Sequence, residues 1–260
     1  MKPKAVKRMT DNYQTTTYLE GIISVSAAIT ANKREIYNVF IDKSKYEKRD
    51  RKITHLISFL KKMSVPYSLS ERTYIDSIAD GTSHGGVVAK VGEYAYSGLD
   101  ETLNSLKNNS YAVMLDGVED PYNFGYSIRN LFAFGCKSFI VPSRNWLSAS
   151  NVVATASAGA SELCSISCIE NDLQLVDALK NSNIKIICSA LSSTSIPLFD
   201  FKPDSPFVLF IGGEKRGISK AFMEIADSVI HIPYSNENAK YSLPTASCAA
   251  IFGSYLSSLK

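Results

Sequence analysis

The chain has 260 residues, 45% hydrophobic and 20% charged, a balance typical of a folded protein with a buried core rather than a disordered one. No apolar run is long enough to cross a bilayer, and the basic N-terminus lacks the apolar stretch of a signal peptide, so we expect a cytoplasmic protein without a membrane partner. The five cysteines and three histidines are too scattered for a metal site, so we expect reduced thiols and no metal.

The net charge of +3 is divided unevenly along the chain. Residues 1–97 contain 16 Lys and Arg against 10 Asp and Glu, whereas residues 98–260 contain 12 against 15. A basic front half favours contact with a polyanion such as nucleic acid. Much of the excess lies between Lys43 and Lys62, so a solvated charged face explains these charges equally well.

The front half alternates helical and strand patterns. We predict a helix over 18–30, where Leu19, Ile22 and Ile23 have helical spacing, and a strand over 35–41. Residues 43–50 are expected to form an exposed loop or helix start, and 53–63 an amphipathic helix that ends before Pro66. A strand follows the two glycines of HGGVVAKVGEY. These elements predict a small α/β domain over 1–97, followed by a linker with a short helix over 98–110.

From residue 111 the pattern becomes strand followed by helix. Strands are predicted at 111–118, 137–141, 163–169, 185–191, 207–211 and 229–233, and helices at 123–134, 151–160, 173–179 and 243–259. This alternation predicts an α/β domain with a mainly parallel sheet covered on both faces. Ligands of such sheets bind beyond the carboxyl ends of the strands.

Three segments at these strand ends contain candidate site residues. In DGVEDPYNFGYSIRN, Asn123 is placed to cap a helix that carries Arg129, and Gly125 leaves room for a ligand or another backbone. In LFIGGEKRGIS, Glu214 lies in a tight glycine loop where it can accept backbone N–H groups; the loop lacks the Gly-Lys-Ser/Thr ending of a phosphate-binding loop. In the third segment Ser242 is placed to cap a C-terminal helix rich in small residues. Taken singly, an ordinary capped helix or turn accounts for each segment at least as well as a ligand site.

Taken together, the order and spacing of the segments resemble the SpoU (TrmH-like) family of RNA ribose 2′-O-methyltransferases, in the SPOUT superfamily. Its motif N-x-G-x-x-x-R is matched by Asn123, Gly125 and Arg129. Its motif G-x-E-x-x-G after an apolar strand is matched by Gly212, Glu214 and Gly217. Its third motif, Ile-Pro followed later by Ser-Leu-Asn, is matched by Ile232, Pro233, Ser242 and Leu243, but Pro244 replaces the asparagine. The resemblance covers 111–260 and extends loosely to the front half, which resembles the substrate-binding domain of larger members.

The resemblance implies a fold, a cofactor and partners. The domain over 111–260 would have trefoil-knotted SPOUT topology, an exception to the rarity of knots, and would form a homodimer. S-adenosylmethionine would be the cofactor, and ribosomal or transfer RNA the substrate. The implied cofactor-binding positions are Ser189, Ala190, Leu191, Ile211, Gly212, Gly213, Gly217, Ile232, Ser242 and Leu243.

The resemblance also implies catalytic roles, which we assign to Arg129, Asn123, Glu214 and Ser242. A guanidinium does not readily lose its proton, so we expect Arg129 to hydrogen-bond the ribose 2′-oxygen or the adjacent phosphate rather than to act as a base. Asn123 would orient Arg129 or the ribose, and Glu214 would hold the loop. The contribution of the missing asparagine would be absent or supplied by Ser242, Thr245 or Ser247.

Two other functions remain open at this point. A catalytically inactive family member acting as an RNA-binding or ribosome-assembly factor is favoured by Pro244 and opposed by Arg129 and Glu214. A nucleotide-dependent α/β enzyme of another kind requires a phosphate-loop glycine spacing that the sequence lacks.

Overall fold

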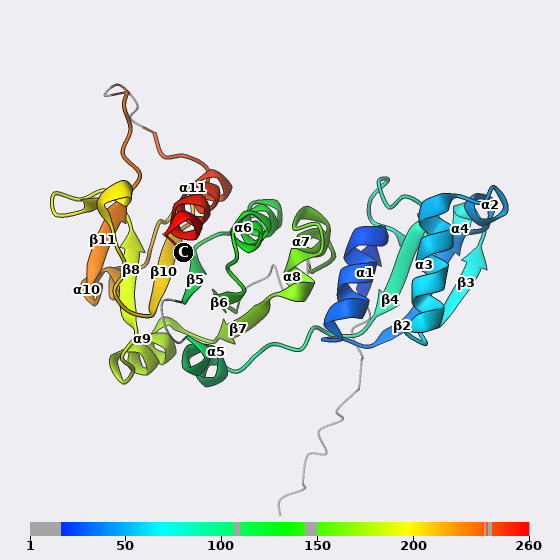
Figure 1. Cartoon of the computed structure of the whole chain (residues 1–260), viewed down its shortest axis with the longest axis horizontal. Helices are drawn as coiled ribbons and strands as arrows, with labels where there is room; N and C mark the ends of the chain where they lie inside the picture. The colour runs from blue at the N-terminus through cyan, green and yellow to red at the C-terminus, as the bar shows by residue number, and fades with distance from the viewer. Residues whose placement is uncertain (1–16, 107–109, 144–149, 237, 239–240, 260) are drawn as a thin grey trace, which may run out of the picture.

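The structure, a computed structural model, describes residues 17–106, 110–143, 150–236, 238 and 241–259. Figure 1 shows an N-terminal domain built on a four-stranded sheet beside a C-terminal domain built on a seven-stranded sheet. No helix in these described residues is long and apolar enough to span a membrane.

The N-terminal domain has a mixed sheet of order β1-β4-β2-β3. Its elements are β1 (Thr17–Glu20), α1 (Ile22–Ala31), β2 (Ile36–Asp42), α2 (Lys43–Glu47), α3 (Arg51–Lys62), β3 (Tyr67–Ser70), α4 (Arg72–Ile78) and β4 (Val87–Val91). Strand β4 is antiparallel to both β1 and β2, and β3 is parallel to β2. Residues 43–50, expected to be a loop or helix start, contain α2, which Asp42 caps by accepting the Ser44 N–H.

The amphipathic pattern of α3 explains how this domain closes. Ile53, Leu56 and Leu60 are buried and belong to the same core as the inward residues of β2 and β4. Asp50 caps the helix by accepting the N–H groups of residues 52 and 53. The predicted helix over 53–63 is therefore confirmed, with its start two residues earlier than expected.

The C-terminal domain has a sheet of order β7-β6-β5-β10-β8-β11-β9, in which all the strand pairs described are parallel. Its first elements are α5 (Leu99–Ser105), β5 (Tyr111–Asp116), α6 (Pro121–Ala133), β6 (Ser138–Pro142), α7 (Ser150–Ala156), α8 (Ala160–Leu163), β7 (Ser165–Ile169) and α9 (Asp172–Lys180). Then follow β8 (Lys185–Ser189), β9 (Ile196–Pro197), a 3-10 turn (Leu198–Asp200), β10 (Phe207–Gly212), α10 (Lys220–Glu224), β11 (Ser228–His231) and α11 (Thr245–Ser258).

Alternate residues of the central strands enter two separate cores. Val113 and Leu115 of β5 pack in the core that includes residues of α6 and α11, whereas Ala112 and Met114 pack in the core that includes residues of α5, α9 and α10. The period of two along a strand places successive side chains on opposite faces of the sheet. The prediction of a mainly parallel sheet covered on both faces is confirmed.

Two of the predicted helices differ from the structure by more than a shift of their ends. The helix predicted over 18–30 is wrong at its start, because 17–20 form strand β1, in which Leu19 pairs with Ala89. Gly21, with a φ of 83°, separates this strand from α1. The helix predicted over 151–160 breaks at Ala158 and Gly159, whose φ angles are 50° and 79°.

This break brings the two domains into close contact. A Cβ on Gly159 would lie 2.6 Å from the Cβ of Ala27 in α1, so glycine is required here by the approach of the domains. The buried Ser24 hydroxyl donates to the Ala154 carbonyl oxygen at 3.2 Å, and Ala154 itself belongs to the N-terminal core. Helices α7 and α8 also contact α6, so α1 is linked through them to the helix that carries Arg129.

The segment expected to be a linker, 98–110, contains α5, and residues 107–109 lie outside the described part of the chain. Leu103 and Leu106 are buried in the core of the C-terminal domain, and the Thr102 and Ser167 hydroxyls are 2.6 Å apart. Most of this segment therefore packs on the seven-stranded sheet. The domain boundary itself stays a prediction.

Candidate active site at the carboxyl edge of the large sheet

The loop after β10 packs backbone against backbone. Gly213 donates its N–H to the Asp116 carbonyl oxygen at 2.7 Å, and Gly217 donates to the Gly213 carbonyl oxygen at 2.9 Å. A Cβ on Gly213 would lie 2.0 Å from the Gly117 carbonyl oxygen, and one on Gly212 would lie 2.6 Å from the Gly217 carbonyl carbon. Glycine is therefore required at these two positions because other backbone segments of the protein, rather than a ligand, approach them closely.

Asp116 holds this loop at both ends, a role that sequence reasoning missed. Its carbonyl oxygen accepts the Gly213 N–H, and its carboxylate accepts the Ser219 N–H at 2.7 Å. The residue is buried, which strengthens the requirement that its polar atoms be paired. An aspartate at the end of an otherwise apolar strand was the only sign of this role in the sequence.

Glu214 joins the three candidate segments. Its Oε1 accepts the Asn123 side-chain N–H at 3.1 Å and the Thr245 backbone N–H at 3.4 Å. The buried Thr245 hydroxyl donates to the Gly212 carbonyl oxygen at 3.2 Å. We name Asn123, Glu214 and Thr245 the clamp. Glu214 was expected to accept several backbone N–H groups, but it accepts one, together with a side-chain amide.

Helix α6 presents an exposed polar and aromatic stripe that ends at Arg129. Tyr122, Tyr126 and Arg129 follow the spacing i, i+4, i+7 and are all exposed. Within the part of the chain that the structure describes, the Arg129 side chain makes no hydrogen bond or ion pair, so its guanidinium is free for a ligand. The two tyrosines were not among the residues predicted for the site.

The start of α6 differs from the sequence expectation. The helix begins at Pro121, and Asp120 caps it by accepting the Tyr122 N–H at 2.8 Å, so Asn123 is not the cap. The Asn123 side chain instead donates to the Glu214 carboxylate. Gly125 is required by helix packing, because a Cβ there would lie 2.7 Å from the Ala156 Cβ.

The start of α11 also corrects a prediction. The helix begins at Thr245 rather than at 243, and Pro244 occupies the N-cap position without a side-chain cap. Ser242 is exposed, lies outside the helix and does not cap it. The physical reason is Pro244, because a residue before proline is disfavoured in helical conformation. Asn130 fixes this helix start to α6 by donating its side-chain N–H to the Ala246 carbonyl oxygen at 2.8 Å.

The other predicted cofactor positions follow β8 and β11, the strands next to β10 in the sheet. Strand β8 ends at Ser189, Ala190 donates its N–H to the Ile230 carbonyl oxygen at 3.0 Å, and the Leu191 side chain is 84% exposed. Ile232 follows β11, and the Leu243 N–H is bound by the Tyr234 hydroxyl oxygen at 3.1 Å. All of these positions therefore lie near the carboxyl edge, where β10 ends at Gly212.

The thiols near this edge do not have the lowered pKa of a reactive cysteine. Burial raises the pKa of Cys188 to about 12 and also raises the pKa of Cys248, beside Leu243. A cysteine nucleophile needs the opposite shift, because the thiolate is the reactive form. Among the described residues, no group of three or more His, Cys, Asp or Glu side chains could hold a metal ion.

Residues 110–253 match the SpoU rRNA Methylase family, which is more than half of the chain, and residues 18–97 match the domain described as RNA 2'-O ribose methyltransferase substrate binding. The chain belongs to the SpoU rRNA methylase family. The predicted activity, methylation of a ribose 2′-hydroxyl in RNA, is confirmed with it, as is the predicted substrate-binding role of the N-terminal domain.

Relatives of this SpoU chain match it along nearly their whole length. The 23S rRNA (guanosine-2'-O-)-methyltransferase RlmB of Haemophilus influenzae is 28% identical over 236 residues, which cover 89% of this chain and 94% of that protein. RlmB of Escherichia coli K12 is 27% identical over 235 residues, 89% and 95% of the two chains.

Solved structures show the same SpoU fold. An AdoMet-bound rRNA methyltransferase from Sinorhizobium meliloti has a TM-score of 0.75 at 19% identity and covers 93% of this chain and 86% of its own. The SpoU methyltransferase AviRb from Streptomyces viridochromogenes, in complex with AdoMet, has a TM-score of 0.76 at 17% identity and covers 94% and 89%. The individual roles of the SpoU motif residues in this chain remain predictions.

Proposed function

We propose that this SpoU enzyme transfers a methyl group from S-adenosylmethionine to the 2′-oxygen of a guanosine in 23S rRNA. The RlmB relatives, which carry this activity in their names, support the choice of RNA and nucleotide. The observation that carries the chemistry is the position of Arg129, a free guanidinium on α6, the same helix from which Asn123 reaches the glycine loop.

The chemistry of the carboxyl edge fits S-adenosylmethionine. The exposed Leu191 side chain, with Ile232 and Leu243, offers apolar surface that an adenine ring would cover, and the loops after β8, β10 and β11 offer backbone polar groups to its edge. We assign cofactor binding to Ser189, Ala190, Leu191, Ile211, Gly212, Gly213, Gly217, Ile232, Ser242 and Leu243. When bound, S-adenosylmethionine supplies an electrophilic methyl on a sulfonium sulfur.

Arg129 positions and stabilises the attacking oxygen. As the 2′-oxygen forms its bond to the methyl carbon and the carbon–sulfur bond breaks, the guanidinium donates hydrogen bonds to that oxygen or to the adjacent phosphate. The guanidinium stays protonated, so the hydroxyl proton passes to solvent water. Tyr122 and Tyr126 flank the RNA along the same exposed stripe.

The clamp sets the position of α6 relative to the glycine loop after β10. Asn123 is six residues before Arg129 on one rigid helix, and its amide is fixed by Glu214, whose carboxylate also holds the start of α11. Glu214 therefore acts as a positioning residue. Thr245 contributes the backbone N–H to Glu214 and the hydroxyl bond to Gly212, so Pro244 leaves these contacts in place.

Three further expectations are proposed with this function. The C-terminal chain path forms the trefoil knot of its family, and exposed apolar side chains of the C-terminal domain such as Phe199 and Tyr241 are partly covered in a homodimer. The five free cysteines accord with the reducing cytoplasm. Analytical ultracentrifugation tests the dimer directly.

Labelled methyl transfer tests the function. The enzyme is incubated with methyl-labelled S-adenosylmethionine and, separately, deproteinised 23S rRNA, 16S rRNA and total tRNA from an unmodified strain. We expect label in 23S rRNA, and nuclease digestion with mass spectrometry should place it on the ribose of one guanosine. Label confined to tRNA, or placed on a base, would refute the proposal. Calorimetry with S-adenosylmethionine separates an active enzyme from an inactive relative, which would not bind it.

A further inference from the structure

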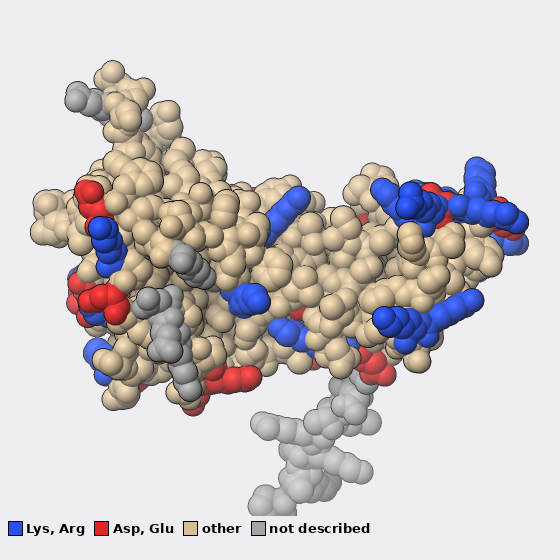
Figure 2. Space-filling view, viewed as in Figure 1, with Lys and Arg blue, Asp and Glu red and all other residues tan. Residues whose placement is uncertain are grey.

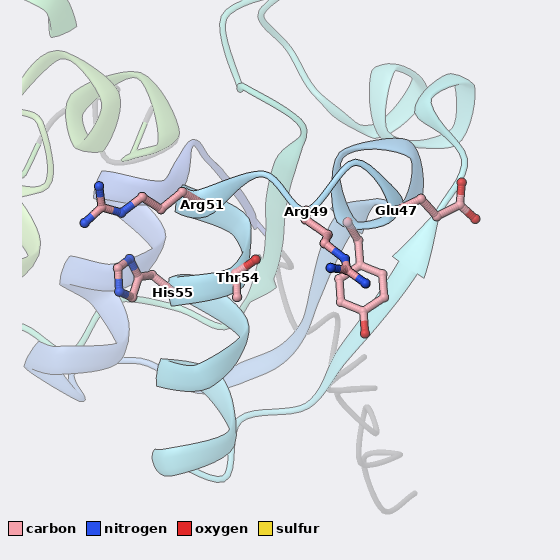
Figure 3. A pocket seen from close by; sticks show the side chains of 6 residues that line it. Glu47, Arg49, Arg51, Thr54 and His55 are labelled. Atoms are coloured by element: carbon pink, nitrogen blue, oxygen red, sulfur yellow. The ribbon is translucent and has the colours of Figure 1, made fainter.

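A second candidate site lies on the N-terminal domain, apart from the carboxyl edge. A hollow of about 760 Å³ opens where α2 ends and α3 begins, lined by Tyr46, Glu47, Arg49, Arg51, Thr54 and His55 (Figure 3). This volume is within the range of sites that hold small molecules or single chemical groups. None of the lining residues takes part in the site described above.

The hollow lies in the most basic part of the domain surface. Figure 2 shows Lys and Arg side chains gathered over α2 and the start of α3. Two of the lysines there have partners, since Lys43 pairs with Glu71 at 3.7 Å and Lys45 donates to the Gly85 carbonyl oxygen at 2.8 Å. The side chains of Arg49 and Arg51 make no hydrogen bond or ion pair with any residue that the structure describes. Two guanidiniums at the hollow are therefore available to an anion.

Side chains, not the end of the helix, supply the donors. Asp50 already accepts the N–H groups of residues 52 and 53 at 2.9 and 3.2 Å, so the N-terminus of α3 has little left to offer an anion. Arg49 has a φ of 55° and donates its backbone N–H to the Tyr46 carbonyl oxygen at 2.9 Å, which bends the chain between the two helices.

Figure 3 shows the two arginines on opposite sides of the hollow. The Arg51 and His55 side chains lie one turn apart on α3 and extend to one side, the Arg49 side chain extends to the other, and the Glu47 carboxylate is directed away from both arginines (Figure 3). Tyr46 is 46% exposed, so the hollow also offers an aromatic ring. An anion combined with a flat ring is the chemistry of a nucleotide.

We propose that this hollow binds an unpaired segment of the RNA substrate, with separate backbone phosphates held by Arg49 and Arg51 and a base stacked on Tyr46. Arginine binds phosphate oxygens through paired N–H donors, and exposed aromatic rings stack on unpaired bases. The inference rests on the proposed function, because it takes the methylated substrate to be RNA. It adds the face of the N-terminal domain that contacts RNA and the residues that do so.

The test variant removes both guanidiniums while respecting the backbone. Arg49→Asn suits the left-handed φ, which asparagine tolerates better than alanine, and Arg51→Gln keeps a polar side chain in the helix. The matched control is Lys61→Gln/Lys62→Gln, which removes two exposed positive charges from the other end of the same helix. Circular dichroism checks that both variants fold.

Binding is measured with a fluorescent single-stranded 12-mer RNA and with deproteinised 23S rRNA, over a range of salt concentrations. For Arg49→Asn/Arg51→Gln we expect a Kd on the order of tenfold higher. The slope of log Kd against log salt should fall by about 1.4, because each arginine holds its own phosphate. The KM for 23S rRNA should rise in parallel, while the Kd for S-adenosylmethionine stays unchanged. The control should shift RNA binding by no more than about twofold.

Tyr46 provides an independent measurement. Tyr46→Phe keeps the ring and should bind RNA like the wild type, whereas Tyr46→Ala should weaken binding by about fivefold or more without changing the salt slope.

The inference is overturned if the arginine double variant and the lysine control have equal effects on Kd and slope. It is also overturned if the arginine variant binds naked RNA normally and loses affinity only for protein-containing ribosomal particles, which would indicate a protein partner. Either result leaves the proposed function intact as long as the wild type methylates 23S rRNA; absence of methyl transfer by the wild type would instead refute that function.

Discussion

Arg34 and Glu162 form an ion pair across the contact between the two domains, with 2.9 Å between Nη2 and Oε1 and both side chains only 2% exposed. Lys33 and Tyr94 reinforce this contact, since both side chains donate to the Cys164 carbonyl oxygen. Desolvation of two charges offsets much of their attraction, so such a pair contributes little net stability, but an unpaired member is costly.

Arg34→Met should therefore destabilise the protein by about 3–5 kcal/mol at pH 7, because it leaves the Glu162 carboxylate buried without its partner. The double variant Arg34→Met/Glu162→Leu should recover most of this loss. Chemical denaturation at pH 7 measures both. Equal stability of the single variant and the wild type would show that the pair does not hold the domains.

The same pair predicts a pH dependence. Burial raises the pKa of Glu162 above its ordinary value of 4.5, and its Oε2 has no hydrogen-bond partner in the described structure. Between 4.5 and the higher pKa of the folded state, Glu162 binds more protons in the folded protein than in the unfolded chain. The contribution of Glu162 to the unfolding free energy therefore falls as the pH rises through this window. Glu162→Gln cannot titrate and should show a flatter dependence of unfolding free energy on pH. Parallel curves for the variant and the wild type would refute this.

Arg129 is predicted to act in the transition state. Arg129→Ala should lower kcat by a factor on the order of 10²–10³ or more while leaving the Kd for S-adenosylmethionine within about twofold of the wild type. Arg129→Lys keeps the charge without the planar fork and should restore only part of the rate. Single-turnover methyl transfer measures the rate, and calorimetry measures the Kd. Unimpaired turnover by the alanine variant would remove Arg129 from the mechanism.

The contact between Asn123 and Glu214 predicts a charge conflict. Asn123→Asp would place a second carboxylate about where the amide now donates at 3.1 Å, and the repulsion should weaken S-adenosylmethionine binding by up to about tenfold. Adding Glu214→Gln removes the repulsion and should restore affinity, because the glutamine amide can donate to the carboxylate introduced by the first substitution. Titration calorimetry on the single and double variants measures both affinities; failure of the second substitution to rescue the first would contradict the clamp.

Two glycines of the same loop should respond differently to alanine. At Gly213 a Cβ would lie 2.0 Å from the Gly117 carbonyl oxygen, so Gly213→Ala must displace the loop and should abolish S-adenosylmethionine binding. At Gly217 the Cβ meets nothing within 4 Å, and the cost of Gly217→Ala comes only from its φ of 65°, about 1–2 kcal/mol. Thermal denaturation and cofactor titration distinguish the two; equal effects would mean that backbone packing does not govern this loop.

Local patterns were sufficient to predict much of the fold. The spacing of Ile53, Leu56 and Leu60 indicated α3, and apolar strands such as Tyr111–Asp116 indicated the parallel sheet, because burial on one or both faces leaves a periodic mark in the sequence. Tyr18 and Leu19 were wrongly assigned to the helix over 18–30, because an apolar stretch next to a helix cannot be distinguished from the helix by its spacing. Their strand character depends on pairing with β4, some seventy residues later, which no local pattern contains.

The site was predictable in its segments but not in its contacts. The motifs located Asn123, Glu214 and Gly212, which the structure brings to one edge of the sheet. They did not indicate the capping by Asp120 or the two bonds of Thr245, because these depend on how separate segments meet. Pro244 is the one residue that departs from the family motif. Thr245, which directly follows it, makes the contacts that join the start of α11 to the glycine loop.

Gly159 allows the N-terminal domain to approach the helices that support Arg129 closely. It therefore also affects the distance between the proposed RNA-binding hollow and Arg129. If the N-terminal domain holds the RNA as proposed, the distance from its surface to Arg129 would select which ribose is methylated. Gly159→Ala would force α1 outward, since its Cβ would meet Ala27 at 2.6 Å, and the methyl group should then appear on a different nucleotide or on none. Mass mapping of the modified RNA would show that displacement as a change in the position of the methylated nucleotide.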